Sequence, residues 1–301
     1  MKRSESIVVI AILSVIFLII IPISPGLMDV FLVFSVALSL LILLVALFMQ
    51  DTLEFSTYPT MLLLVTLFRL ILNIAATRLI LGNNGEAGQV INTFGSIVVG
   101  SNLVVGFVIF VIIVLIQFIV ITKGAERVSE VAARFTLDAM PGKQMAIDAD
   151  LNAGIIDDET ARRRRVDIQR EADFYGAMDG ASKFVKGDAI VGILITLVNI
   201  IGGIIIGVLG LGGTVMSLDR VVQVYMLATV GNGIASQLPA LMVSTATGII
   251  VTRSANETTF GESLITQLFG QPTVLFLLGG TVALISLVPG IPPLPGLVMG
   301  A

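Results

Sequence analysis

The sequence predicts an all-α polytopic membrane protein with seven to eight transmembrane helices and a small α-helical cytoplasmic insert. Of its 301 residues, 56% are hydrophobic and only 13% are charged, whereas about a quarter of the residues of soluble domains carry a charge. The apolar residues form runs of about 16 to 25 residues, which suit a hydrocarbon layer about 30 Å thick. The charges gather in residues 123–188, which hold 11 of the 17 Lys and Arg and 13 of the 21 Asp and Glu.

The first predicted span covers residues 7–21 and follows Lys2 and Arg3. A secretory signal peptide is the alternative, because the charge, the length of the apolar run and the trailing Pro22 and Pro25 fit one loosely. However, no small-x-small cleavage site closes the run, and further spans follow at once. We therefore favour an uncleaved first helix.

Six further apolar runs predict spans at 27–49, 59–81, 97–121, 189–211, 230–251 and 273–288. An eighth apolar segment follows Pro292, Pro293 and Pro295, but it is too short to cross a bilayer before residue 301. We therefore expect the sequence to stop inside or before a last helix.

The distribution of positive charge predicts the orientation. With Met1 in the cytoplasm, the inner side holds 14 Lys and Arg and the outer loops hold only Arg220, leaving aside Arg69 and Arg78 within the third span. Cytoplasmic loops are the ones enriched in Lys and Arg. The predicted organisation is helices 1–4 in residues 1–121, the cytoplasmic insert in 122–188, and helices 5–7 with the start of helix 8 in 189–301.

The insert is predicted to be a small folded unit of two helices. Residues 126–135 place Val128, Val131 and Phe135 on one side, which is typical of an amphipathic helix. A second helix at 157–175 begins with three acidic residues, which suit the positive end of a helix. We interpret Arg162–Arg165 as the solvated surface of this helix, and a contact with anionic lipid headgroups is the alternative.

The third span carries a charge where one is expensive. Arg69 lies near its middle, where a charge costs roughly 3 kcal/mol or more. Thr66, Asn73 and Thr77 recur with it at steps of three or four, so they form one polar stripe that must face protein or water. The stripe fits either a buried salt bridge that fixes helix packing or the wall of an ion or polypeptide path. Arg78 lies on the opposite face and can extend to the outer surface.

The segment 230–239 interrupts an apolar span with Asn232, Gln237, Pro239 and two glycines. A broken backbone at membrane depth occurs where it is buried in protein or lines a water-filled cavity. The segment therefore predicts either such a break beside a pore or a kinked helix that serves packing.

Asp188 stands where the insert meets the fifth span, after Lys183 and Lys186. Desolvation at the membrane edge favours its neutral form and the lysines favour its charged form, so it could take and release a proton. Capping the start of a helix is the alternative, because Asp is a favoured N-cap residue.

Missing residue types exclude several chemistries. Without Cys and His there is no disulfide, thiol nucleophile, imidazole base or common zinc site. The net charge of −4 does not indicate a nucleic-acid partner. Phosphate-loop, intramembrane-protease and serine-elbow motifs are all incomplete. We therefore expect no enzyme, no metal site and no cofactor.

Two stretches of the insert, 134–154 and 174–188, closely resemble the flagellar/Hr/invasion protein export pore (FHIPEP) family. The resemblance extends to residues 120–128, to the polar stripe of Arg69 together with Arg78, and to residues 289–293. The match runs from about residue 51 to the end, and such long identity in polar residues is specific. The first stretch contains the family's signature loop, with Asp138, Pro141, Gly142, Lys143, Asp148 and Asp150.

This resemblance implies an eight-span component of the export gate of a bacterial type III secretion apparatus in the cytoplasmic (inner) membrane. It implies a homo-oligomeric ring of nine, contacts with other export-gate membrane subunits and the flagellar basal body, and protons, or sodium ions, as coupling ions. Family members continue into a large cytoplasmic domain that receives exported proteins and chaperones, and this sequence lacks it. Residues 135–139 favour the flagellar branch, and the injectisome branch is the alternative.

The resemblance also implies roles for particular residues. The family's charged residues associated with proton-driven export correspond to Arg78, Lys183 and Asp188, which favours the proton role for Asp188. Relatives usually have Asp where this chain has Asn232, so a second acidic site in that span is in doubt. A secondary transporter or channel built on Arg69 and Asn232 remains a second hypothesis, although no inverted repeat supports it. A membrane enzyme is a third.

Overall fold

The computed structural model describes residues 3–100, 102–212, 215–253, 260–285, 294 and 298. Every regular element in these residues is a helix, so the predicted all-α class is confirmed for them. The elements are α1 (Arg3–Phe17), α2 (Pro25–Phe48), η1 (Thr52–Phe55), α3 (Tyr58–Gly82), α4 (Gln89–Val99), α5 (Leu103–Ile116), η2 (Gln117–Thr122), α6 (Lys123–Asn152), α7 (Asp158–Leu209), α8 (Leu218–Thr252), α9 (Phe260–Phe269) and α10 (Pro272–Ile285). Lys2, the 289–293 motif and, apart from residue 298, the predicted eighth segment lie outside the described residues.

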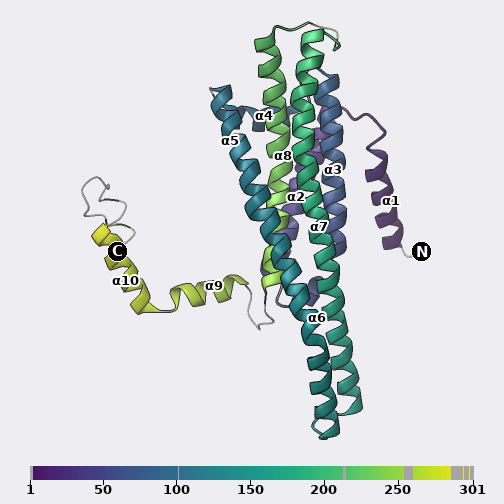
Figure 1. Ribbon diagram of the computed structural model, residues 1–301, viewed down its shortest axis with the longest axis vertical. Coiled ribbons are helices and arrows are strands. Elements are labelled where there is room, and N and C mark those ends of the chain that lie inside the picture. Colours follow the sequence, from purple (N-terminus) through teal and green to yellow (C-terminus); the bar gives the residue numbers. More distant parts are fainter. Residues whose placement is uncertain are drawn as a thin grey trace. The chain divides into compact units, whose positions relative to one another are not determined.

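The helices fall into two units. Residues 1–46 and 51–254 form the first, which holds α1, most of α2, and α3 to α8. Residues 47–50 and 255–301 form the second, which holds α9 and α10. All the sites discussed below lie in the first unit, where α3, α7 and α8 run side by side (Figure 1).

Five stretches of helix in the described residues are long and apolar enough to cross a membrane: Pro25–Phe48, Tyr58–Gly82, Leu103–Asn152, Asp158–Leu209 and Leu218–Thr252. By contrast, α1 has 15 residues and α10 has 14, which is short for a span of about 20 residues. The multi-pass membrane character is supported, but the predicted count of seven to eight spans is not reached by these criteria.

The predicted span 97–121 begins later than expected. Helix α4 ends at Val99, and α5 begins at Leu103 after Gly100, whose φ of 57° favours glycine. The Asn102 side chain caps α5 by accepting hydrogen bonds from the backbone of Val104 and Val105. Gly100 and Asn102 are a turn signal and a favoured N-cap residue, so the sequence marks this break, and the predicted span 97–121 passed over it.

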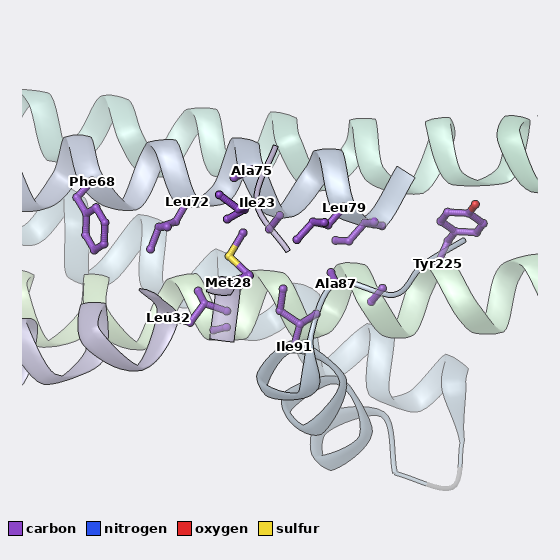
Figure 2. Packing of buried hydrophobic residues seen from close by; sticks show 14 of the residues in the cluster. Ile23, Met28, Leu32, Phe68, Leu72, Ala75, Leu79, Ala87, Ile91 and Tyr225 are labelled. Atoms are coloured by element: carbon purple, nitrogen blue, oxygen red, sulfur yellow. The ribbon is translucent and has the colours of Figure 1, made fainter. Parts of the chain in front are cut away.

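The short helix α4 lies across α8 and helps to close the core (Figure 1). The carboxylate of Asp29 on α2 accepts hydrogen bonds from the backbone of Gln89 and Val90 and so caps α4. Figure 2 shows the resulting core, in which Met28 of α2, Leu72 of α3 and Ile91 of α4 pack together. This packing fixes α3 and α8 beside each other.

Helix α8 continues through the segment for which we predicted either a broken backbone or a kinked helix. It runs from Leu218 to Thr252 with Pro239 inside it, so the prediction of a broken backbone at 230–239 is wrong. The glycines serve close packing instead, because a Cβ at Gly231 would meet the carbonyl oxygen of Ile91 and one at Gly233 would meet the ring of Phe110. The apparent helix-breaking sequence is where α4 and α5 approach α8.

A Gly231→Ala substitution is expected to destabilise the protein by roughly 1–3 kcal/mol, because the added methyl group must displace the α4 backbone. The thermal unfolding midpoint in detergent would measure this. Gly248→Ala in the same helix is the matched control, because a Cβ there meets nothing within 4 Å, and alanine is the better helix former. An unchanged midpoint for Gly231→Ala would contradict the close α4–α8 contact.

The insert contains two helices, as expected, but both extend beyond the predicted bounds. Helices α6 and α7 form a hairpin, and both continue without a break into the apolar segments beside them (Figure 1). The predicted start at Asp157 is confirmed, since its side chain accepts a hydrogen bond from the backbone of Thr160. Hydrogen bonds from the Thr160 side chain and backbone lower the pKa of Asp157. The predicted ends at 135 and 175 are wrong, because the hydrophobic pattern changes at the membrane edge while the backbone helix does not.

Candidate functional site

A buried ion pair joins α3 to α7. Nη2 of Arg69 lies 3.0 Å from Oδ2 of Asp188, and the two side chains are only 8% and 9% exposed. The same nitrogen lies 3.4 Å from the backbone oxygen of Ser236 on α8, so Arg69 contacts all three helices. The acidic partner of Arg69, which the sequence left open, is therefore Asp188. Because Asp188 lies inside α7 rather than at its start, the N-cap interpretation is wrong.

Two amide contacts extend this arrangement. Nδ2 of Asn232 on α8 donates to Oδ1 of Asn73 on α3 at 2.6 Å. Nε2 of Gln117 donates to the backbone oxygen of Gln237 at 3.1 Å. The polar stripe predicted on α3 thus contacts polar groups of both α7 and α8.

A cavity of about 60 Å³ lies among these groups. Its wall is contributed by α3, α5, η2, α7 and α8, and includes Arg69, Asn73, Gln117, Asp188, Ser236 and Gln237. A buried water needs roughly 10–15 Å³ of such space and two to four polar partners. Nε and Nη1 of Arg69 and Oε1 of Gln237 are buried without a hydrogen-bond partner among the described residues. The cavity is therefore large and polar enough to hold several waters.

The helix geometry changes at Gln117, beside this cavity. Residues Gln117–Thr122 form one π-helical turn, η2, between α5 and α6. An extra residue in a turn rotates the side chains that follow, and such turns are frequent at functional sites. Pro239 has no N–H, so α8 lacks one hydrogen bond next to the carbonyls of Ser236 and Gln237 that face the site.

The structure brings together some predicted site residues and separates others. Lys183 does not contact Asp188: its Nζ lies 2.7 Å from Oδ2 of Asp179, and this hydrogen bond and charge raise the pKa of Lys183. Arg78 lies about two and a half turns from Arg69 along α3 and donates to the carbonyls of Ile19 and Ile20 after α1. Both residues lie apart from the cavity.

The residues of the predicted signature loop lie within α6 instead of a loop. These are Asp138, Pro141, Gly142, Lys143, Asp148 and Asp150. Three of them pair across the hairpin: Lys143 with Glu171, Asp148 with Arg165, and Asp150 with Arg164. Pro141 is tolerated because this helix is exposed, so water can satisfy the carbonyl that loses its donor. Arg164 and Arg165 therefore pair with carboxylates of α6 across the hairpin while remaining partly exposed to solvent.

Two contributors to the site, Gln117 and Ser236, were missed from the sequence, and so was a buried amide outside the cavity wall, Asn199. Gln117 is the one amide in the apolar run 103–121, and Asn199 is the one amide in the run 189–211. Polar residues at membrane depth are costly and tend to be functional, so this isolation was a usable signal. Ser236 contributes only its backbone oxygen, which carries no signal in the side-chain sequence.

Replacing Asn232 tests the amide pair. Asn232→Leu leaves Oδ1 of Asn73 without its donor and is expected to lower the free energy of unfolding by about 1–3 kcal/mol. Asn232→Asp is expected to cost less, because Asn73 can turn its own amide to donate. Chemical denaturation of both variants in detergent measures the difference. Equal losses would contradict a role for this hydrogen bond.

Comparison with known proteins identifies the family. The FHIPEP family model matches residues 15–301. The chain is 53% identical over 287 residues to "Flagellar biosynthesis protein FlhA" of Bacillus subtilis, covering 95% of this chain and 42% of that protein. It is 52% identical over 289 residues to the protein of that name from Escherichia coli K12, covering 95% and 41%. The corresponding values for Salmonella typhimurium are 50% over 289 residues, 95% and 41%.

The chain spans about two fifths of the length of these curated relatives. No solved structure matches it. The family predicted from the two stretches of the insert is confirmed, and the relatives carry flagellar names, in agreement with the predicted branch. On the extent of the family match and on these identities, the chain belongs to the FHIPEP family.

Proposed function

We propose that this chain is the membrane part of an export-gate component of the bacterial flagellar type III protein secretion apparatus. In this proposal it lies in the inner membrane, with its N-terminus and the α6–α7 hairpin on the cytoplasmic side. It couples the proton motive force to export of unfolded flagellar proteins. The observation that carries the coupling role is the buried Arg69–Asp188 pair beside a cavity large enough for water.

The pair can act as a switch between helices. With Asp188 ionised, the attraction of opposite charges in a poorly solvated site holds α3 against α7. A proton on Asp188 removes that attraction and leaves Arg69 charged, with the Ser236 carbonyl as its remaining partner. Because such a site tolerates an unpaired charge poorly, α3 and α7 must then readjust or the cavity must admit more water. Protonation at Asp188 is in this way converted into helix movement.

The energy available from each proton sets a limit on this mechanism. One charge crossing 100 mV releases about 2.3 kcal/mol, so export of a long chain requires many protons. Sodium ions are the alternative coupling ion. The carboxylate of Asp188, the carbonyl of Ser236 and the side-chain oxygen of Gln237 are oxygen donors beside the cavity, but the adjacent Arg69 charge opposes a cation there.

Partners follow from the proposed assembly. We propose a ring of nine copies in contact with other export-gate membrane subunits and the flagellar basal body. Exported proteins and chaperones would bind the part of the relatives that this chain does not span. An injectisome gate is a weaker candidate, because the relatives compared carry flagellar names. A secondary transporter or channel is weaker still, because no inverted repeat is evident in the sequence.

A chimera tests the function. This chain would replace the matching two fifths of the Bacillus subtilis relative in a strain that lacks its own copy. Restored export of flagellar proteins and restored swimming are expected. A chimera that reaches the membrane and assembles but exports nothing would contradict the proposal. The same chimera with the α6–α7 hairpin deleted serves as the negative control.

A further inference from the structure

Beyond the ion pair, polar groups continue along the interface of α3, α7 and α8. Asn199 lies about three turns after Asp188 on α7, so the two share one face of that helix. On α8, Tyr225 lies about two turns before Asn232 and shares a face with it. We call Arg69, Asn73, Asp188, Asn199, Tyr225 and Asn232 the polar line.

Close contacts place Asn73 of α3 and Tyr225 of α8 against α7. A Cβ at Gly192 would lie 3.9 Å from Nδ2 of Asn73, so this part of α7 faces α3. At Gly203 and Gly207 a Cβ would meet the ring of Tyr225, so this part of α7 faces α8. Asn199 lies on α7 between Gly192 and Gly203. Figure 2 shows the Tyr225 side chain pointing away from the ribbon of α8.

Asn199, Tyr225 and Asn232 of the polar line have polar atoms that no group among the described residues satisfies. Asn199 is 0% exposed, and neither its Oδ1 nor its Nδ2 has a hydrogen-bond partner in the part of the chain that the structure describes. The hydroxyl of Tyr225 and Oδ1 of Asn232 are also buried without partners, at residues 1% and 3% exposed. At membrane depth each such group costs several kcal/mol. Ordered water is the usual partner of buried polar groups of this kind.

We propose that the polar line holds a chain of water molecules that conducts protons between Asp188 and the end of the bundle near Gly82 and Leu209. The inference rests on the proposed function, because Asp188 is the group that receives the proton. A proton enters at the Tyr225 end, each water passes one on to the next, and the last proton binds the Asp188 carboxylate. Asn199 and Tyr225 position the waters and do not themselves change protonation state.

Cysteine labelling tests directly whether water reaches Asn199, because the chain contains no other cysteine that could react. An Asn199→Cys variant in membranes is expected to react with a small, positively charged methanethiosulfonate reagent, since the reaction needs a hydrated thiolate. Val230→Cys is the matched control: Val230 is also 0% exposed, but it packs in an apolar cluster on α8. We expect Asn199→Cys to react at least about tenfold faster. Equal rates would overturn the water chain.

Conduction is tested by export from the chimera. Asn199→Leu removes the polar atoms at similar size and is expected to reduce export about tenfold or more, while Asn199→Ser, which keeps a hydroxyl, is expected to retain most of it. Normal export with Asn199→Leu would overturn the conducting role. If Asp188→Asn loses export but Asn199→Cys does not react, the water chain is overturned and the proposed function stands. Full export by Asp188→Asn would overturn the proposed function and the inference with it.

Discussion

Asp188→Asn is expected to abolish export of flagellar proteins while leaving the chain in the membrane. Asparagine has nearly the size of aspartate but cannot take up or release a proton at neutral pH, so the proposed switch stays in one state. The measurement is export of flagellar proteins into the medium by the chimera, with membrane level and complex size measured alongside. Asp188→Glu keeps a titrating carboxyl and is expected to retain part of the activity.

The single variant also leaves Arg69 buried with a neutral partner, so reduced stability could mimic a lost function. The double variant Arg69→Gln/Asp188→Asn separates the two effects, because it removes both charges and leaves two amides that can hydrogen-bond. Normal assembly without export in the double variant is the expected result. Export at the unsubstituted level by either variant would rule out proton uptake at Asp188.

Arg69→Leu is expected to produce the largest loss of stability, about 3–5 kcal/mol in the free energy of unfolding. The substitution leaves the Asp188 carboxylate buried without its partner and removes the contact with the Ser236 carbonyl. Urea denaturation in detergent, followed by circular dichroism, measures the change. The double variant Arg69→Leu/Asp188→Leu is expected to recover most of the loss, because replacing a buried pair by apolar residues is often neutral.

An exposed pair provides the control for this experiment. Arg164 and Asp150 lie 3.2 Å apart on the hairpin, with side chains 50% and 39% exposed. Arg164→Leu is expected to change the free energy of unfolding by about 1 kcal/mol or less, because water already solvates both charges. Similar losses in the free energy of unfolding for Arg69→Leu and Arg164→Leu would show that burial of the Arg69 pair adds nothing to stability.

Local features of the chain were predictable to different degrees. The helix start at Asp157 and the polar stripe around Arg69 follow from residue type and spacing, which act within a few turns of helix. The division of the 97–121 span was marked by Gly100 and Asn102 but was missed, whereas the continuity of α8 through Pro239 was not predictable in this way. In both places tertiary packing contributes: α4 is held by Asp29 and by its contact with Gly231, and both lie far away in sequence.

By itself, the sequence determined the all-α membrane class, the family, and the cost of placing Arg69 and Asp188 near an apolar environment. Composition, periodicity and charge are properties of the chain alone, so they need no knowledge of its neighbours. Only the tertiary structure decided that Arg69 and Asp188, 119 positions apart in sequence, are partners, and that Lys183 is not. The reason is physical: a buried charge requires compensation, but which group supplies it depends on helix packing through space.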